Sequence, residues 1–266
     1  MSETPPTADE PTEPAATGEA VPAPPPPSLG AAAPAEMTFG GVLNDAFSLY
    51  RAFFSRFFLL ALVVFLVLNL VSALAAVAFQ HSGAGALLFL LVSVTVSIVG
   101  EAWLIGALVF AVQDVRDGRA DDSIGGLLSK ATPFLGRLLV AGILAGLGIA
   151  VGLVLFIAPG LYLLGIWAVF APVIVLEGSG ATEALGRSRA LVAGRFWPVL
   201  GVVLVASIIS GVANGVVSLV LSFLPLFLRY WLGGAVAAAV SVPFVALAVT
   251  LTYFALRDEK AAAQPA

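Results

Sequence analysis

Two side chains in this sequence have types suited to proton transfer: His81, the single histidine, and Glu101, an acid inside a long apolar run. General acid–base catalysis needs a second positioned group, and a metal site needs several ligands close together. No such partners surround His81 at a regular spacing, and the chain has no cysteine. Hydrolase elbows, phosphate-binding loops and dinucleotide fingerprints are also missing. We therefore expect no catalytic residue, no metal site and no cofactor, and we interpret His81 as a loop residue.

Glu101 is a candidate functional residue because an ionisable side chain in hydrocarbon is costly unless it is neutralised, hydrated or paired. Counting from residue 85 at about 1.5 Å per residue places it roughly 24 to 26 Å along the run, closer to one interface than to the midplane. One interpretation is structural pairing with an arginine or a hydrated edge. The alternative is a proton-carrying role in a small transporter or permease.

The basic residues fall on one side of a membrane when the long apolar runs are interpreted as spans. Lys and Arg total 12, and only Arg229 lies on the other side. Cytoplasmic loops carry the excess of Lys and Arg. The pattern therefore predicts a multi-pass protein of the cell (inner) membrane with both termini in the cytoplasm.

The densest basic group is Arg187, Arg189 and Arg195. Near a cytoplasmic surface each arginine is attracted to anionic lipid by about 1 kcal/mol. We predict that these three contact lipid headgroups or a membrane-protein partner. The competing interpretation is that they only set topology, which needs positive charge and no defined geometry.

Composition and run length define the fold class. Hydrophobic residues make up 60% of the chain and charged residues 11%, far from the composition of a soluble domain. About 20 apolar residues cross the hydrocarbon core. We therefore predict an all-α polytopic integral membrane protein with six transmembrane helices, near residues 57–79, 85–112, 134–158, 161–176, 197–222 and 231–255. The fourth is short, at roughly 24 Å, and we expect it to be entered by a tight turn at Pro159 and Gly160.

The domain organisation follows from composition. Residues 1–36 hold ten prolines and no basic residue, and such a segment buries too little apolar surface to offset the entropy of ordering. We predict a disordered Pro/Ala/Glu-rich cytoplasmic tail over 1–36, a six-helix membrane domain over 37–257 and a short cytoplasmic tail over 258–266. The six acids of the first tail account for the net charge of -4, so no field implies nucleic acid as a partner.

Three short amphipathic segments precede the first, third and fifth spans. Apolar residues recur at helical spacing from Phe39 to Phe54, from Ile124 to Ala131 and from Ala181 to Val192. We expect Asp122 to cap the second segment and Glu183 to pair with Arg187 in the third. The chain then consists of three units, each an interfacial helix followed by a transmembrane hairpin. Glycine pairs within the spans predict close helix contacts; they are Gly142 with Gly146, Gly148 with Gly152, and Gly211 with Gly215.

One stretch resembles a known family. The residues in question are Pro159, Gly160, Glu177, Gly178, Arg187, Ser188 and Trp197, within a run from Ile157 to Trp197. This run is similar to the membrane domain attached to some bacterial glycerophosphodiester phosphodiesterases, which also occurs alone. The resemblance implies an integral membrane module over about residues 38–257. It also implies that the phosphodiesterase chemistry resides in a separate metal-binding domain.

The sequence thus favours a non-enzymatic multi-pass membrane protein, either a scaffold or a lipid-interacting module. Its expected partners are membrane lipids, including anionic ones, and a further membrane protein. The alternative is a small transporter or permease using Glu101. A lipid-modifying membrane enzyme is the third candidate.

Overall fold

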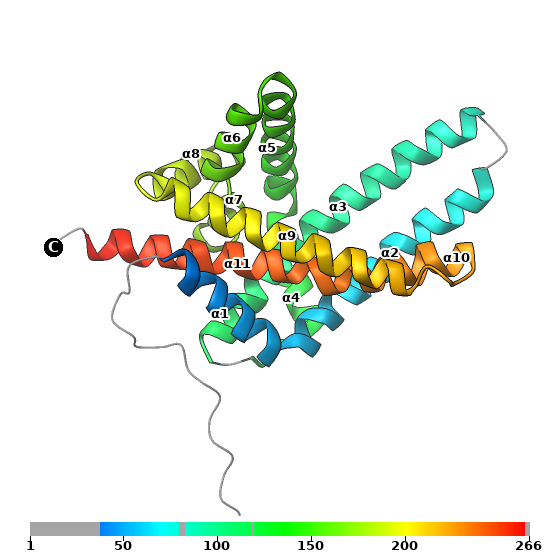
Figure 1. Cartoon of the computed structure of the whole chain (residues 1–266), viewed down its shortest axis with the longest axis horizontal. Helices are drawn as coiled ribbons and strands as arrows, with labels where there is room; N and C mark the ends of the chain where they lie inside the picture. The colour runs from blue at the N-terminus through cyan, green and yellow to red at the C-terminus, as the bar shows by residue number, and fades with distance from the viewer. Residues whose placement is uncertain (1–37, 80–82, 119, 264–266) are drawn as a thin grey trace, which may run out of the picture.

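A computed structural model describes residues 38–79, 83–118 and 120–263 (Figure 1). Every regular element in these ranges is helical, and six segments are long and apolar enough to cross a membrane. The predicted all-α polytopic fold is confirmed. The six segments are Phe54–Leu74, Leu87–Arg116, Ile124–Leu155, Ile157–Glu177, Phe196–Val220 and Arg229–Ala262. His81 and the predicted tail over 1–36 lie outside the described residues.

The first unit consists of α1 (Phe39–Ala52), α2 (Phe54–Phe79) and α3 (Gly83–Arg116). Thr38 caps α1, since its hydroxyl accepts a hydrogen bond from the amide of Gly41 at 3.3 Å. The buried face of α1 consists of Val42, Ala46 and Leu49. The predicted amphipathic helix is therefore present, although Phe39, Phe47 and Phe54 of its apolar set point outward.

The second unit begins with α4 (Ile124–Ala131), a 3-10 turn η1 (Thr132–Phe134) and α5 (Leu135–Leu155). Its second span is broken into α6 (Ile157–Ile166) and α7 (Phe170–Glu177). The predicted Pro159–Gly160 turn is wrong, because the chain reverses three residues before Pro159, at the extended backbone of Phe156. Pro159 lies in the first turn of α6, where its missing N–H has no partner to lose.

The third unit consists of α8 (Ala181–Val192), α9 (Phe196–Val220), the short α10 (Leu226–Leu228), the π-helix η2 (Arg229–Gly233) and α11 (Gly234–Ala262). The predicted apolar face of α8 is buried through Ala184, Leu185, Leu191 and Val192. The residues from 258 to 262 continue α11 as helix.

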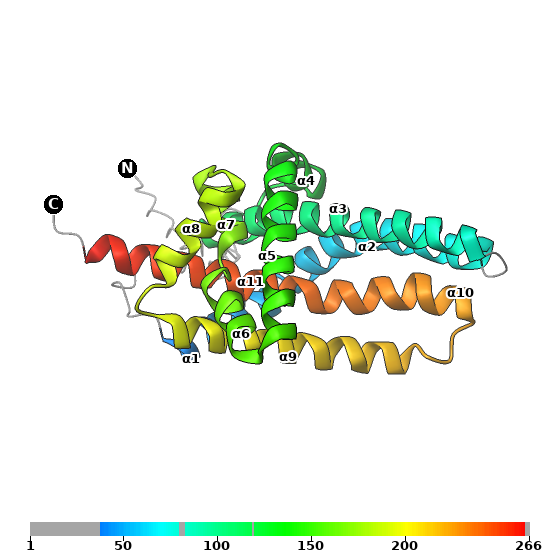
Figure 2. The ribbon, with the colours of Figure 1, turned by 90° about the horizontal axis from the view of Figure 1, so that it is seen from above.

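The hairpins are splayed rather than bundled in parallel. Helices α9 and α11 run side by side, and α2 and α3 form a second arm, while α5 with α6 crosses these pairs steeply in both views (Figures 1 and 2). Helix α11 is central, packing against α9, α2 and α1. The core lies where the arms meet; its fully buried side chains include Phe57, Leu60, Leu104, Leu108, Ile174, Leu247 and Tyr253.

Candidate functional site

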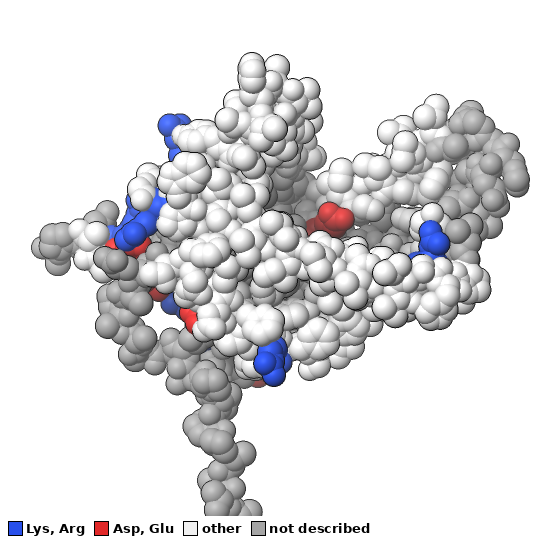
Figure 3. Space-filling model, in the orientation of Figure 1, with Lys and Arg blue, Asp and Glu red and all other residues white. Residues whose placement is uncertain are grey.

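A groove of about 380 Å³ opens between α3, α5 and the start of α7. Its walls are aliphatic, and Glu101 is the only acidic residue among those that line it. Figure 3 shows an acidic patch in the hollow between the α3 and α5 arms. The lining comprises Ile98, Glu101, Ala102, Ile105, Leu138, Leu139, Gly142, Ile143, Gly146, Leu147, Phe170 and Ala171.

Two glycines widen the groove instead of tightening a helix contact. A Cβ added at Gly142 or Gly146 would meet no atom within 4 Å. The predicted close contact is therefore wrong for this pair, and also for Gly211 and Gly215, which face open space. The same prediction is confirmed for the remaining pair of α5, because a Cβ at Gly148 would lie 2.7 Å from Trp167 and one at Gly152 would lie 2.9 Å from the backbone of Gly160.

Glu101 lies near the middle of α3 rather than near its end. In this 34-residue helix, eighteen residues precede Glu101 and fifteen follow it. Helix α3 extends beyond residue 112 to Arg116, so the apolar segment is longer than predicted, and the depth of Glu101 relative to an interface stays a prediction. The Glu101 side chain is exposed and forms no hydrogen bond or ion pair with any residue that the structure describes. The expected pairing with an arginine is therefore not seen in this part of the chain.

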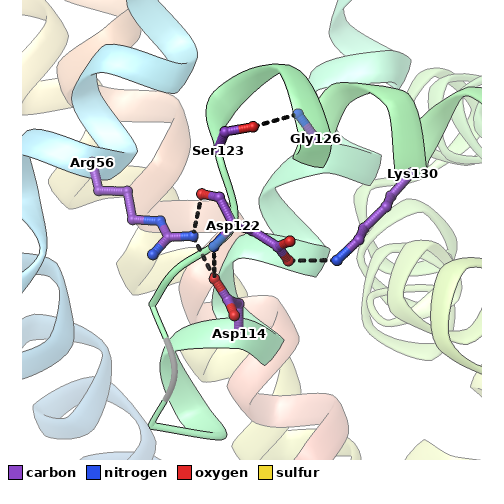
Figure 4. A network of polar contacts seen from close by, with 6 residues as sticks. All are labelled: Arg56, Asp114, Asp122, Ser123, Gly126 and Lys130. Atoms are coloured by element: carbon purple, nitrogen blue, oxygen red, sulfur yellow. Dashed lines mark hydrogen bonds and ion pairs between the residues drawn. The ribbon is translucent and has the colours of Figure 1, made fainter.

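Polar residues at the ends of the spans form a network around Arg56 (Figure 4). The Arg56 guanidinium pairs with the buried carboxylate of Asp114 and donates to the backbone oxygen of Asp122 at 2.8 Å. Asp122 does not cap α4 as predicted, because its carboxylate pairs with Lys130 at 2.6 Å. Ser123 caps α4 instead, accepting from the amide of Gly126 at 3.1 Å.

Two further ion pairs hold the end of α11, one to the first unit and one within the third unit. Arg116, at the end of α3, pairs with Asp258 of α11 at 2.7 Å and stacks on the ring of Phe254 with 4.0 Å to its centroid. Arg195, at the start of α9, pairs with Glu259 of α11 at 2.7 Å. Basic side chains on three units thus meet carboxylates at one end of the helices.

Four of the seven residues that carry the family resemblance lie at the α7–α8 corner: Glu177, Gly178, Arg187 and Ser188. Glu177 accepts from Arg187 at 3.0 Å and from the hydroxyl of Tyr253 at 3.0 Å. The predicted Glu183–Arg187 pair is wrong, because the Glu183 carboxylate accepts from the amide of Gly180 at 3.1 Å. Arg187 is held by the preceding helix instead.

Gly178 and Ser188 complete this corner. Gly178 ends α7 with φ of 70°, a left-handed conformation that favours glycine, and its carbonyl accepts from Arg137 at 2.6 Å. Ser188 is fully buried; its hydroxyl donates to the carbonyl of Ile166 and accepts from the amide of Val169. Ser188 of α8 therefore satisfies the backbone groups on both sides of the break between α6 and α7.

The remaining candidate residues lie apart. Trp197 is 77% exposed and points outward from α9. Arg189 is exposed and forms no ion pair with the residues that the structure describes, whereas Arg187 and Arg195 are held by carboxylates. The predicted basic cluster is thus divided, with one arginine left facing outward. Arg229, the one basic residue predicted on the other side of the membrane, lies in η2 beside the ring of Tyr230.

Sequence reasoning missed Tyr50 of α1. Its hydroxyl donates to the carbonyl of Val240 in α11, and its ring meets Phe244 edge-on with 5.7 Å between centroids. Burial raises the pKa of Tyr50 to about 12, because the phenolate form would lose its hydration. An aromatic residue on an amphipathic face was visible, but its partner lies 190 residues away in the sequence.

Comparison with known proteins places the chain among membrane proteins without defining its activity. It is 36% identical over 99 residues to a UPF0259 membrane protein of Pectobacterium carotovorum subsp. carotovorum. The similar stretch covers 37% of this chain and 39% of that relative. No family model matches the chain, and no solved structure matches it. The similarity gives no link to the phosphodiesterase membrane domain that the α7–α8 residues resemble.

Proposed function

We propose that this chain is a non-enzymatic membrane protein that binds a lipid-like amphiphile in the groove between α3 and α5. The observation that supports this function is the groove itself: an aliphatic cavity with an open glycine wall and one carboxylate. Binding sites for small molecules are concave and mostly apolar, with a few polar groups that orient the ligand. In a membrane, the lipids around the protein supply alkyl chains that could fill such an apolar groove.

Substitution of Gly146 tests this function. Leucine at Gly146 would extend into the groove, because a Cβ there meets nothing within 4 Å. Leucine at Gly211 is the matched control, since it also adds a side chain to an open glycine within a span but lies outside the groove lining. We expect native mass spectrometry to detect less co-purified lipid on the Gly146→Leu protein than on the Gly211→Leu protein. Equal lipid on both proteins would contradict the proposed function.

A second candidate is a small transporter or permease that uses Glu101. Its mid-helix position favours this role, because acids that carry protons across a membrane lie at depth. We expect Glu101→Gln to abolish any pH-gradient-dependent flux into vesicles while leaving expression unchanged. A flux that persists in this variant would remove the transporter. A lipid-modifying enzyme is less favoured, because the groove lining offers no nucleophile beside Glu101.

The proposed setting is the cell (inner) membrane with both termini in the cytoplasm. This orientation rests on the distribution of Lys and Arg, and it would place the paired charges around Arg56 and Asp258 at the cytoplasmic face. Arg189 would then face the anionic headgroups of that leaflet, as a lipid contact or a contact to a membrane-protein partner.

A further inference from the structure

We infer that the amphiphile bound in the α3–α5 groove carries a positively charged amine headgroup, which neutralises Glu101. This inference rests on the proposed function and specifies the ligand class of the same groove. It begins from the position of Glu101, inside the segment Leu87–Arg116 and beside aliphatic residues. A carboxylate inside such an apolar segment is costly unless a proton, water or a counter-charge accompanies it.

The described part of this chain supplies no counter-charge to the groove. Lining residues other than Glu101 are aliphatic, aromatic or glycine, and none is basic. The arginines that lie at the end of the helices are engaged elsewhere: Arg56 by Asp114, Arg116 by Asp258 and Arg187 by Glu177. The positive group that would complete the site must therefore come from an occupant.

A second copy of the chain is a poor source of that positive group. The basic residues described in the structure lie toward the ends of the apolar segments or in the interfacial helices, whereas Glu101 lies at the middle of α3. A copy packed against the α3–α5 groove would thus bring apolar side chains to Glu101 and leave its charge unpaired.

The volume of the groove, about 380 Å³, and its aliphatic lining with one carboxylate suit an alkyl chain with a small head. The lining includes Ile98, Leu139 and Leu147, and Gly146 leaves the wall without a side chain. An ammonium donates up to three hydrogen bonds and pairs strongly with a carboxylate. A phosphate or carboxylate headgroup would instead meet Glu101 with like charge.

A series of amphiphiles with one chain and three heads tests the inference. We propose to titrate the purified full-length protein, in uncharged detergent, with dodecylamine, dodecanol and dodecanoic acid, and to measure each Kd by native mass spectrometry. We expect dodecylamine to bind about tenfold more tightly than dodecanol, corresponding to one charge-assisted contact, and dodecanoic acid to bind most weakly. Glu101→Gln should remove the amine preference, whereas Asp121→Asn, which removes an exposed acid outside the groove, should leave it intact.

The outcomes separate the two levels of the proposal. An equal Kd for amine and alcohol, or an amine preference that survives Glu101→Gln, would overturn the headgroup inference while leaving the groove as the binding site. Unchanged binding of all three compounds in Gly146→Leu, with Gly211→Leu as control, would overturn the proposed function itself. If the native protein gave the mass of a dimer and Gly146→Leu gave only the monomer, a second copy would be shown to fill the groove. That result would overturn the proposal that an amphiphile binds there.

Discussion

The hydroxyl of Ser188 donates a hydrogen bond to the carbonyl oxygen of Ile166 at 2.9 Å, across 22 residues of sequence. The Ser188 hydroxyl oxygen in turn accepts a hydrogen bond from the amide of Val169 at 3.3 Å. These two backbone groups flank the break between α6 and α7, where the helical ladder is interrupted. One buried side chain on α8 therefore satisfies both sides of a discontinuity in the fourth span.

We expect Ser188→Ala to lower the free energy of unfolding by about 1 to 3 kcal/mol, because it leaves a buried carbonyl and a buried amide without their partner. Thermal unfolding of the purified protein measures this loss. Ser207→Ala is the control, since Ser207 is exposed on α9. Equal unfolding temperatures for the two variants would contradict the role assigned to Ser188.

The Arg56–Asp114 pair is the most buried ion pair among the described residues, with side chains 15% and 7% exposed. We expect Arg56→Met to lower the free energy of unfolding by about 3 to 5 kcal/mol, because it strands the Asp114 charge. Adding Asp114→Asn should restore part of this loss, since an amide carries no charge. A double variant less stable than Arg56→Met would exclude stranded charge as the cause.

Tyr50 should make stability depend on pH in the alkaline range. Its pKa in the folded protein is about 12 against an ordinary value of 10.0. Its contribution is thus fully present below pH 10 and is lost as pH rises from 10 toward 12. We expect Tyr50→Phe to be less stable than the native protein at pH 8, with the difference shrinking above pH 10. A constant difference across this range, measured by chemical unfolding, would contradict the shift.

The orientation can be tested because the chain has no native cysteine. We expect Ser222→Cys, near Arg229, to react with an impermeant thiol reagent in intact cells. Thr182→Cys, at the start of α8, should react only after lysis. Both positions are exposed in the structure, so a difference in labelling reports sidedness. The reverse pattern would invert the topology predicted from the basic residues.

Arg189 should contribute to lipid binding, whereas Arg187 should contribute mainly to stability. Arg187 is held by Glu177 at 3.0 Å, and Arg189 is exposed. We expect Arg189→Gln to weaken the attraction to anionic vesicles by about 1 kcal/mol without changing the unfolding temperature. Vesicle flotation at two salt concentrations measures the binding. No loss relative to the native protein would leave Arg189 as a topology signal alone.

The six spans could be predicted from sequence because length and apolar composition alone define them, and the three amphipathic helices because their period is local. The contacts at their ends could not. Asp122 and Ser123 were both suitable caps for α4, and the choice depended on Lys130 and Arg56, which draw Asp122 away.

The candidate site was predictable only in part. An acid in an apolar run singled out Glu101, but its place near the middle of α3 required the true end of that helix at Arg116. Glycine spacing in α5 had two possible meanings. Gly152 meets Gly160 across a hairpin, while Gly146 faces the open groove. Which of the two meanings applies depends on whether that face of α5 points toward a neighbouring helix, and the sequence alone does not show this.

The pairing of Arg116 and Arg195 with Asp258 and Glu259 has a consequence for biosynthesis. Both arginines leave the ribosome well before their carboxylates do, since the acids belong to the last turns of α11. Helix α11 also supplies the surface on which α1, α2 and α9 pack. A nascent chain inserted as far as α9 will therefore hold uncompensated positive charge and open helix faces, and it will need its insertion machinery until α11 is delivered.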